Sequence, residues 1–211
     1  MAEVEATQRI AAILAADAAG YTRLMAADEA ATIAALDEAR AVFREHVGSE
    51  RGRVVDTAGD SVLAVFETTA GAVRAARAVQ ARIAEVNAGR TEDRRMLFRV
   101  GVHLGDIHEK ADGSVYGDGV NVAARLQALA DPGGIVVSDT VQSTLRGRPD
   151  VAFAFLGAHT VKNVAEPVRA FRVVTDGAPA AGRPRQTRPV LLAVIASVAA
   201  VTLLTIAGLV L

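Results

Sequence analysis

The sequence of 211 residues contains no cysteine, which excludes disulfide bonds, thiolate metal ligands and cysteine nucleophiles. Aromatic residues make up only 4% of the chain, too few for a base-stacking platform. An excess of positive charge is also missing, because 23 basic residues stand against 24 acidic ones, and we therefore expect no nucleic-acid partner. The hydrophobic share of 51% and the charged share of 22% exclude wholesale disorder.

The C-terminal segment 190–211 is a run of apolar and small residues without a single charge. At about 1.5 Å of rise per residue, a helix of this length spans roughly 30 Å, the thickness of the hydrocarbon core of a bilayer. We therefore predict a transmembrane helix, with a buried core helix as the alternative. Arg183, Arg185 and Arg188 precede it, and the positive-inside rule predicts a single-pass protein of the inner (plasma) membrane whose preceding domain is cytoplasmic.

The remaining chain divides by composition. Residues 175–189 are rich in proline, glycine and arginine and are predicted to be a linker. Residues 1–174 are expected to form one soluble domain. The apolar stretch at 7–14 is too short for a signal peptide, and acidic residues precede it. The sequence leaves open what stimulus the protein answers and whether the chain continues after Leu211.

Within the domain, short apolar runs alternate with amphipathic segments of helical spacing. Two apolar runs flank the turn formed by residues 57–60, a pattern that predicts a β-hairpin. Because strands and helices alternate while hairpins are mixed in, we predict an α/β (α+β) sandwich with a mixed or antiparallel sheet. Strands are expected at 9–16, 53–55, 61–66, 96–107, 135–137, 151–161 and 168–174, and helices at 28–47, 68–87, 119–130 and 139–145.

Two aspartates are candidates for chemistry. Asp17 ends an apolar run and precedes a turn of small residues, Ala18-Ala19-Gly20-Tyr21-Thr22. A carboxylate at this position can bind a hard cation, and the N–H groups of the turn can bind phosphate oxygens. Taken alone, Asp17 is more simply interpreted as a helix N-cap. Asp60 lies at the tip of the predicted hairpin, where Gly-Asp is also an ordinary turn pair. Carboxylates on adjacent strand ends can share two metal ions, which assist an in-line phosphoryl displacement.

A third candidate is the run YGDGVNVAARL at residues 116–126. If the run is helical, Asn121 and Arg125 lie one turn apart on one face, while Val122 and Leu126 make an adjoining apolar face. An amide beside a guanidinium can orient a sugar and stabilise charge on a pentavalent phosphate. The alternative is a solvated polar face of the helix.

The motifs AADAAGYT, DTAGDSVLAVF and YGDGVNVAARL, followed by LGAHTVKNVAEPVRAFRV, occur in this order. Together they resemble the catalytic domain of the class III nucleotide cyclases, the adenylate/guanylate cyclase family, from about Arg9 to Val174. The resemblance implies a ferredoxin-like sheet with helices on one face. It also implies a phosphorus–oxygen lyase whose active sites form between two subunits arranged head to tail, and so a homodimer.

The resemblance assigns roles by position. Asp17 and Asp60 match the aspartates that bind two Mg²⁺ or Mn²⁺ ions, and Asn121 and Arg125 match the transition-state pair. Lys162 resembles the lysine that contacts the triphosphate. The implied reaction is attack of the ribose 3′-hydroxyl of ATP on the α-phosphate, which yields 3′,5′-cyclic AMP and pyrophosphate.

Base recognition departs from the family pattern at Asp56 and Ser114, where many adenylate-forming members have lysine and aspartate. An ionised Asp56 can only accept hydrogen bonds, which suits the N1–H and amino groups of guanine, whereas Ser114 can donate or accept. We expect ATP as the substrate, with GTP second and a pyrimidine nucleotide third. The altered pair also motivates a different alternative, a catalytically inactive domain that binds nucleotide and regulates a partner.

Overall fold

The computed structural model describes residues 6–160 and 167–174, and all of them belong to the first of two units into which the chain divides, Met1–Gly177. Three sequence-based expectations lie outside the described residues: Lys162, the linker at 175–189 and the transmembrane helix at 190–211. Within the described ranges, no helix is long and apolar enough to cross a membrane.

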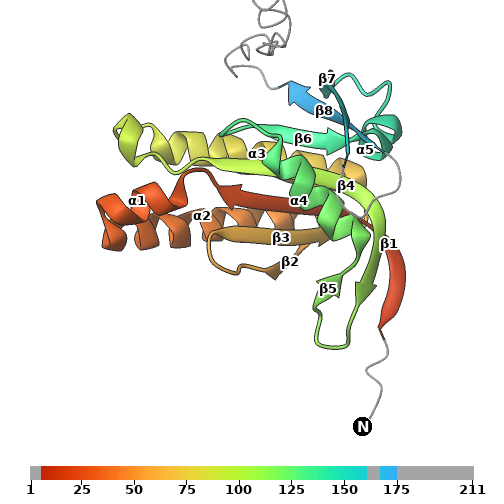
Figure 1. Ribbon diagram of the computed structural model, residues 1–211, viewed down its shortest axis with the longest axis horizontal. Helices are drawn as coiled ribbons and strands as arrows, with labels where there is room; N and C mark the ends of the chain where they lie inside the picture. The colour runs from red at the N-terminus through yellow and green to blue at the C-terminus, as the bar shows by residue number, and fades with distance from the viewer. Residues whose placement is uncertain (1–5, 161–166, 175–211) are drawn as a thin grey trace, which may run out of the picture. The chain divides into compact units, whose positions relative to one another are not determined.

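The framework of the described unit is an eight-stranded sheet in the order β2-β3-β1-β4-β6-β8-β7, with β5 paired to β4 (Figure 1). The β4–β6 pair is parallel and the other pairs are antiparallel, so the predicted mixed sheet is confirmed. The strands are β1 (Thr7–Ala18), β2 (Arg53–Asp56), β3 (Ser61–Phe66), β4 (Phe98–Glu109), β5 (Val115–Tyr116), β6 (Ile135–Ser138), β7 (Ala152–His159) and β8 (Val168–Val174). The helices are α1 (Tyr21–Ala27), α2 (Glu29–Ser49), α3 (Thr69–Asn87), α4 (Asp118–Ala128) and α5 (Asp139–Thr144), with a 3₁₀ turn at Glu92–Arg94.

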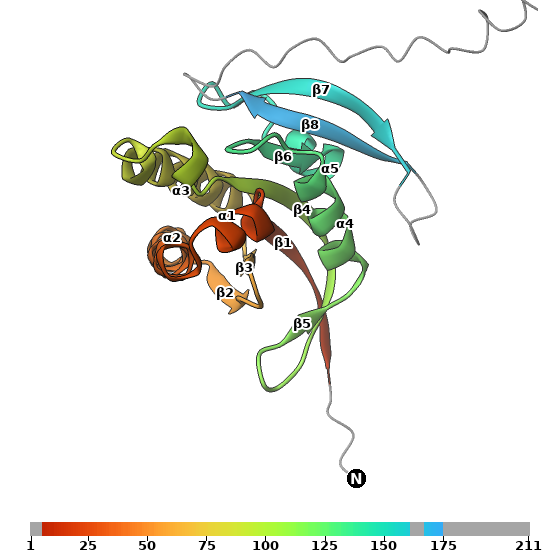
Figure 2. The ribbon, with the colours of Figure 1, turned by 60° about the vertical axis from the view of Figure 1, so that its left-hand side comes forward.

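Helices cover both faces of the sheet. Leu14 and Ala16 of β1 pack with α2 and α3 on one face, whereas Ile13 and Ala15 belong to the apolar cluster under α4 on the other. Figure 2 shows α2 and α3 on one side of β1 and β4 and α4 on the opposite side. The expectation of helices on one face is therefore wrong. The physical reason is that β1 is buried continuously from Ala11 to Ala16, and a strand that is apolar on both faces needs cover on both.

Glycine in β4 allows α4 to approach the sheet closely. A Cβ atom on Gly101 would lie 2.2 Å from the carbonyl oxygen of Ala123 and 2.3 Å from the backbone nitrogen of Gln127. The α4 backbone therefore rests directly on β4. This contact decides which side of α4 faces the sheet and which side faces outward.

The helix boundaries follow from capping residues that the sequence shows. The Asp28 carboxylate accepts a hydrogen bond of 3.0 Å from the N–H of Ala31 at the start of α2. The Thr68 hydroxyl accepts one of 3.1 Å from the N–H of Gly71 at the start of α3. The predicted helices and strands are confirmed within a few residues at each end, while α1 and β5 were not predicted.

Candidate active site

Asp17 and Asp60 lie at adjacent strand ends. Asp17 is the next-to-last residue of β1 and pairs with Ser61, the first residue of β3. Asp60 directly precedes Ser61 and ends the turn between β2 and β3. The β1–β3 register therefore places the two aspartates at the same end of two neighbouring strands inside the sheet.

Both carboxylate oxygens of Asp17 are engaged within the chain. Arg99 lies opposite Asp17 in the β1–β4 pair and donates from Nε to Oδ1 at 3.0 Å and from Nη2 to Oδ2 at 2.7 Å. The side-chain amide of Gln127 on α4 also donates to Oδ1. Neither residue was predicted from the sequence. Arg99 carried a usable signal, because it is the one charged residue in the otherwise apolar first half of β4, Phe98–Val102.

The two aspartates fit a small divalent cation. They supply oxygen ligands only, which Mg²⁺ and Mn²⁺ prefer, and no side chain in the described part of the chain is found to hydrogen-bond to the Asp60 carboxylate. Among the described residues, no group of three or more His, Cys, Asp or Glu side chains could hold a metal ion. A bound ion would therefore take its other ligands from water or substrate phosphates, as Mg²⁺ commonly does.

The turn after β1 has fewer free N–H groups than expected. Ala18 lies inside β1 and is buried, and the N–H of Ala19 donates to the carbonyl oxygen of Leu97 at 2.8 Å. Gly20 is the N-cap residue of α1, and its φ of 71° is a left-handed conformation that glycine adopts more easily than other residues. For the N–H groups of Gly20, Tyr21 and Thr22, no acceptor is found among the described residues. These three groups remain as candidate phosphate ligands, whereas Ala18 belongs to the sheet.

Asn121 and Arg125 occupy the outward side of α4. Both side chains are exposed, and neither has a polar partner within residues 6–160 and 167–174. At about 100° per residue, they lie roughly 200–240° around the helix from Gln127, the residue that reaches Asp17. The structure therefore does not bring Asn121 and Arg125 together with Asp17 and Asp60 inside one chain.

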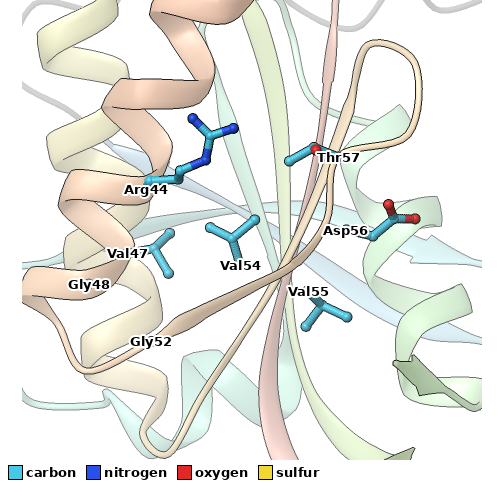
Figure 3. Close-up of a pocket in the computed structure, with 8 residues that line it drawn as sticks. All are labelled: Arg44, Val47, Gly48, Gly52, Val54, Val55, Asp56 and Thr57. Carbon is cyan, nitrogen blue, oxygen red and sulfur yellow. The ribbon is translucent and has the colours of Figure 1, made fainter. Parts of the chain in front are cut away.

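Asp56 and Ser114 lie on two hairpins that contact each other. Arg53 of β2 donates from Nη1 to the carbonyl oxygen of Gly113, at 2.9 Å, in the turn between β4 and β5. Figure 3 shows the Asp56 carboxylate directed away from Arg44, beside a groove of about 450 Å³ between α2 and β2. The Ser114 hydroxyl donates to the carboxylate of Asp112 in its own turn. Ser114 therefore presents mainly acceptor lone pairs to a ligand.

The profile of the family described as "Adenylate and Guanylate cyclase catalytic domain" matches residues 3–174. The chain belongs to this family, whose class of reaction is that of a phosphorus–oxygen lyase. The resemblance inferred from the motifs is confirmed.

Two relatives and one solved structure support the assignment to the cyclase family. Over 169 residues, 80% of this chain, it is 47% identical to "Putative adenylate cyclase 3" of Rhizobium meliloti (strain 1021). It is 33% identical over 133 residues, 62% of the chain, to the adenylate cyclase of Glutamicibacter nicotianae. It spans only 29% and 31% of the lengths of these two relatives. The solved structure of an adenylate/guanylate cyclase/hydrolase from Silicibacter pomeroyi matches with a TM-score of 0.72 at 37% identity, over 82% of this chain and 100% of that one.

Proposed function

We propose that this domain is a nucleotide cyclase that converts ATP to 3′,5′-cyclic AMP and pyrophosphate at two sites shared across a homodimer. One observation carries the proposal. Each chain holds Asp17 and Asp60 on one side of α4, and Asn121 and Arg125 on the other side. A head-to-tail twofold dimer would join complementary halves and close with two complete sites.

Within such a site, the residues of the chain have separate tasks. Asp17 and Asp60 would hold two Mg²⁺ or Mn²⁺ ions. Bound there, the ions would lower the pKa of the ribose 3′-hydroxyl and neutralise charge on the pyrophosphate. The N–H groups of residues 20–22, for which no acceptor is found among the described residues, would bind phosphate oxygens at the end of β1.

The second chain would supply the remaining groups. Arg125 would stabilise the charge that develops on the α-phosphate, and Asn121 would orient the ribose by hydrogen bonds. Lys162 is proposed to contact the triphosphate. No covalent intermediate is required, since the attacking hydroxyl belongs to the substrate itself.

The choice of ATP rests on two relatives named as adenylate cyclases, one of them 47% identical to this chain. GTP is the second candidate, and a specific observation favours it. Asp56 carries a carboxylate, and the Ser114 hydroxyl already donates to Asp112. Both therefore act as acceptors, and guanine offers two donor groups on its N1 edge where adenine has an acceptor at N1.

A substrate panel tests the proposal. The full chain is incubated with Mn²⁺ and each nucleoside triphosphate in turn, and products are resolved by mass. Cyclic AMP as the main product is expected. Absence of a cyclic product from all of them would reject an active cyclase, and nucleotide that binds with micromolar affinity but is recovered unchanged would favour the regulatory alternative.

The base preference is tested by Asp56→Lys. Lysine donates hydrogen bonds to adenine N1 where aspartate can only accept. The ratio of kcat/KM for ATP to that for GTP should therefore rise in D56K, by about tenfold or more for one good charge-assisted hydrogen bond. An unchanged ratio would place Asp56 outside the base pocket.

We also propose that residues 190–211 anchor the domain to the inner membrane as a single span with the domain in the cytoplasm. The uncharged run and the three preceding arginines support this proposal. Membrane fractionation of the full chain and of a chain ending at residue 174 tests it. Equal release of both into the soluble fraction by carbonate at high pH would contradict it.

A further inference from the structure

Arg40 of α2 reaches into the turn between β2 and β3. Its Nη2 donates to the carbonyl oxygens of Thr57 at 2.7 Å and Gly59 at 2.5 Å. Its Nη1 lies 3.3 Å from Oδ1 of Asp37, and its side chain is only 20% exposed. Hydrogen bonds from a guanidinium in such a sheltered position are stronger than those between neutral groups. Arg40 therefore fastens the turn to α2.

The turn has little else to hold it. The β2–β3 ladder ends at the pair Asp56–Leu63 and shifts register between Val54 and Asp56. The turn itself is closed by one backbone hydrogen bond of 3.1 Å, from Ser61 N–H to the carbonyl oxygen of Ala58. Arg40 is the one side chain of the described part that is found to hydrogen-bond to residues 57–60.

We propose that Arg40 is a positioning residue that fixes the Asp60 carboxylate against Asp17, an inference that rests on the proposed function. Gly59, whose carbonyl Arg40 binds, directly precedes Asp60 in the chain. The Asp17 carboxylate is held by Arg99 of the sheet and Gln127 of α4, two residues that lie outside the turn.

The spacing of the two carboxylates therefore depends on how firmly the turn is held. Mg²⁺ requires ligand oxygens at about 2.0–2.1 Å in near-octahedral geometry, so even a small displacement of Asp60 weakens binding. Arg40 acts through the backbone of the turn and touches neither ion nor substrate.

The test compares Arg40→Met and Arg40→Lys with Arg44→Met as the matched control. Arg44 lies one turn further along α2, is exposed, and makes no hydrogen bond to the turn among the described residues. Mn²⁺ is titrated into the full chain without nucleotide and followed by electron paramagnetic resonance. Thermal unfolding is recorded in parallel.

R40M should raise the Mn²⁺ dissociation constant by about tenfold or more, as the loss of a residue that orients a metal ligand typically does. R40K, which keeps the charge and part of the reach, should show a smaller loss, and R44M should bind as the wild type does. In turnover, R40M should raise the half-saturating Mn²⁺ concentration more than it lowers kcat at saturating Mn²⁺.

Wild-type Mn²⁺ affinity in R40M, or an equal loss in R44M, would overturn the inference. If R40M does not fold, R40K decides, and unchanged affinity there would overturn it. Asp60→Asn separates this outcome from failure of the proposed function. If D60N binds Mn²⁺ like the wild type, the metal site itself is wrong; if D60N abolishes binding while R40M does not, only the role of Arg40 falls.

Discussion

Arg99 donates hydrogen bonds of 3.0 and 2.7 Å to the two carboxylate oxygens of Asp17 across the β1–β4 pair. A permanent positive charge therefore lies where a divalent cation is proposed to bind. Arg99 and Gln127 together occupy three of the roughly four lone-pair sites of this carboxylate, so a metal ion competes with them for Asp17. Arg99 thus orients Asp17 and, by its charge and its hydrogen bonds, competes with a cation for the same carboxylate.

Arg99→Met should tighten Mn²⁺ binding in the absence of nucleotide. The substitution removes both a competitor for the oxygens of Asp17 and a nearby like charge, an effect of about 1 kcal/mol or roughly fivefold in affinity at a partly exposed site. Titration followed by electron paramagnetic resonance measures it, with Arg95→Met as control, because Arg95 donates to the carbonyl oxygen of Arg90 instead. Weaker binding in R99M would mean that holding Asp17 in place matters more than the competition.

Complementation tests the shared site. Asp17→Asn and Arg125→Ala should each abolish turnover alone, since every site of either homodimer lacks one group. Mixed in equal amounts under exchange conditions, half of the dimers are heterodimers with one intact site of two, so activity should return to about a quarter of wild type. No recovery, despite subunit exchange shown by differently tagged chains, would contradict a site built from two subunits.

Gly101→Ala should destabilise the domain. Its Cβ would lie 2.2 Å from the carbonyl oxygen of Ala123, so α4 must move away from β4. Overpacking of this kind costs about 1–3 kcal/mol, which urea unfolding measures. Gly48→Ala is the matched control: it lies in α2 with nothing within 4 Å of the added Cβ and should stabilise by about 0.5–1 kcal/mol. Equal stability of G101A and wild type would mean that α4 tolerates a displaced position.

His103 should make the domain less stable in mild acid. Burial lowers the pKa of His103 to about 4 from 6.5, and the charge of Asp139 opposes that shift. Between these values the unfolded chain binds a proton that the folded chain does not, so stability falls as pH drops from 6.5 toward 4, by about 3 kcal/mol in all. Urea unfolding across this range should show a shallower decline in His103→Asn than in wild type. The same slope in both would assign the acid sensitivity to other groups.

Most helices and strands could be predicted because the residues that mark each of them lie within a few positions of one another in the sequence. Asp28 and Thr68 marked the starts of α2 and α3, and the apolar runs on either side of residues 57–60 marked the β2–β3 hairpin. The order of the cyclase motifs predicted the family, which the match over residues 3–174 confirms. The helix α1 was missed because its seven residues carry no side-chain cap, and β5 because it has only two residues.

The partners of the site could not be predicted in this way. Arg99 and Gln127 lie 82 and 110 residues from Asp17 in the sequence, and no periodic pattern links residues so far apart. The spacing within α4 showed that one side is buried, but not which face of the sheet it covers. The expectation of helices on a single face came from the resemblance, and it was wrong because β1 is buried on both faces and α4 covers the second one.

The sequence by itself determined the strands and longer helices, the candidate aspartates and the membership of the cyclase family, because each depends on residue type and short-range spacing. Only the tertiary structure decided that Arg99 and Gln127 hold Asp17, that Arg40 fastens the turn before Asp60, and that Asn121 and Arg125 point away from both. These side-chain positions depend on the strand register and on the close packing of α4 against Gly101. Both are contacts between distant parts of the chain, which form only when the whole domain packs.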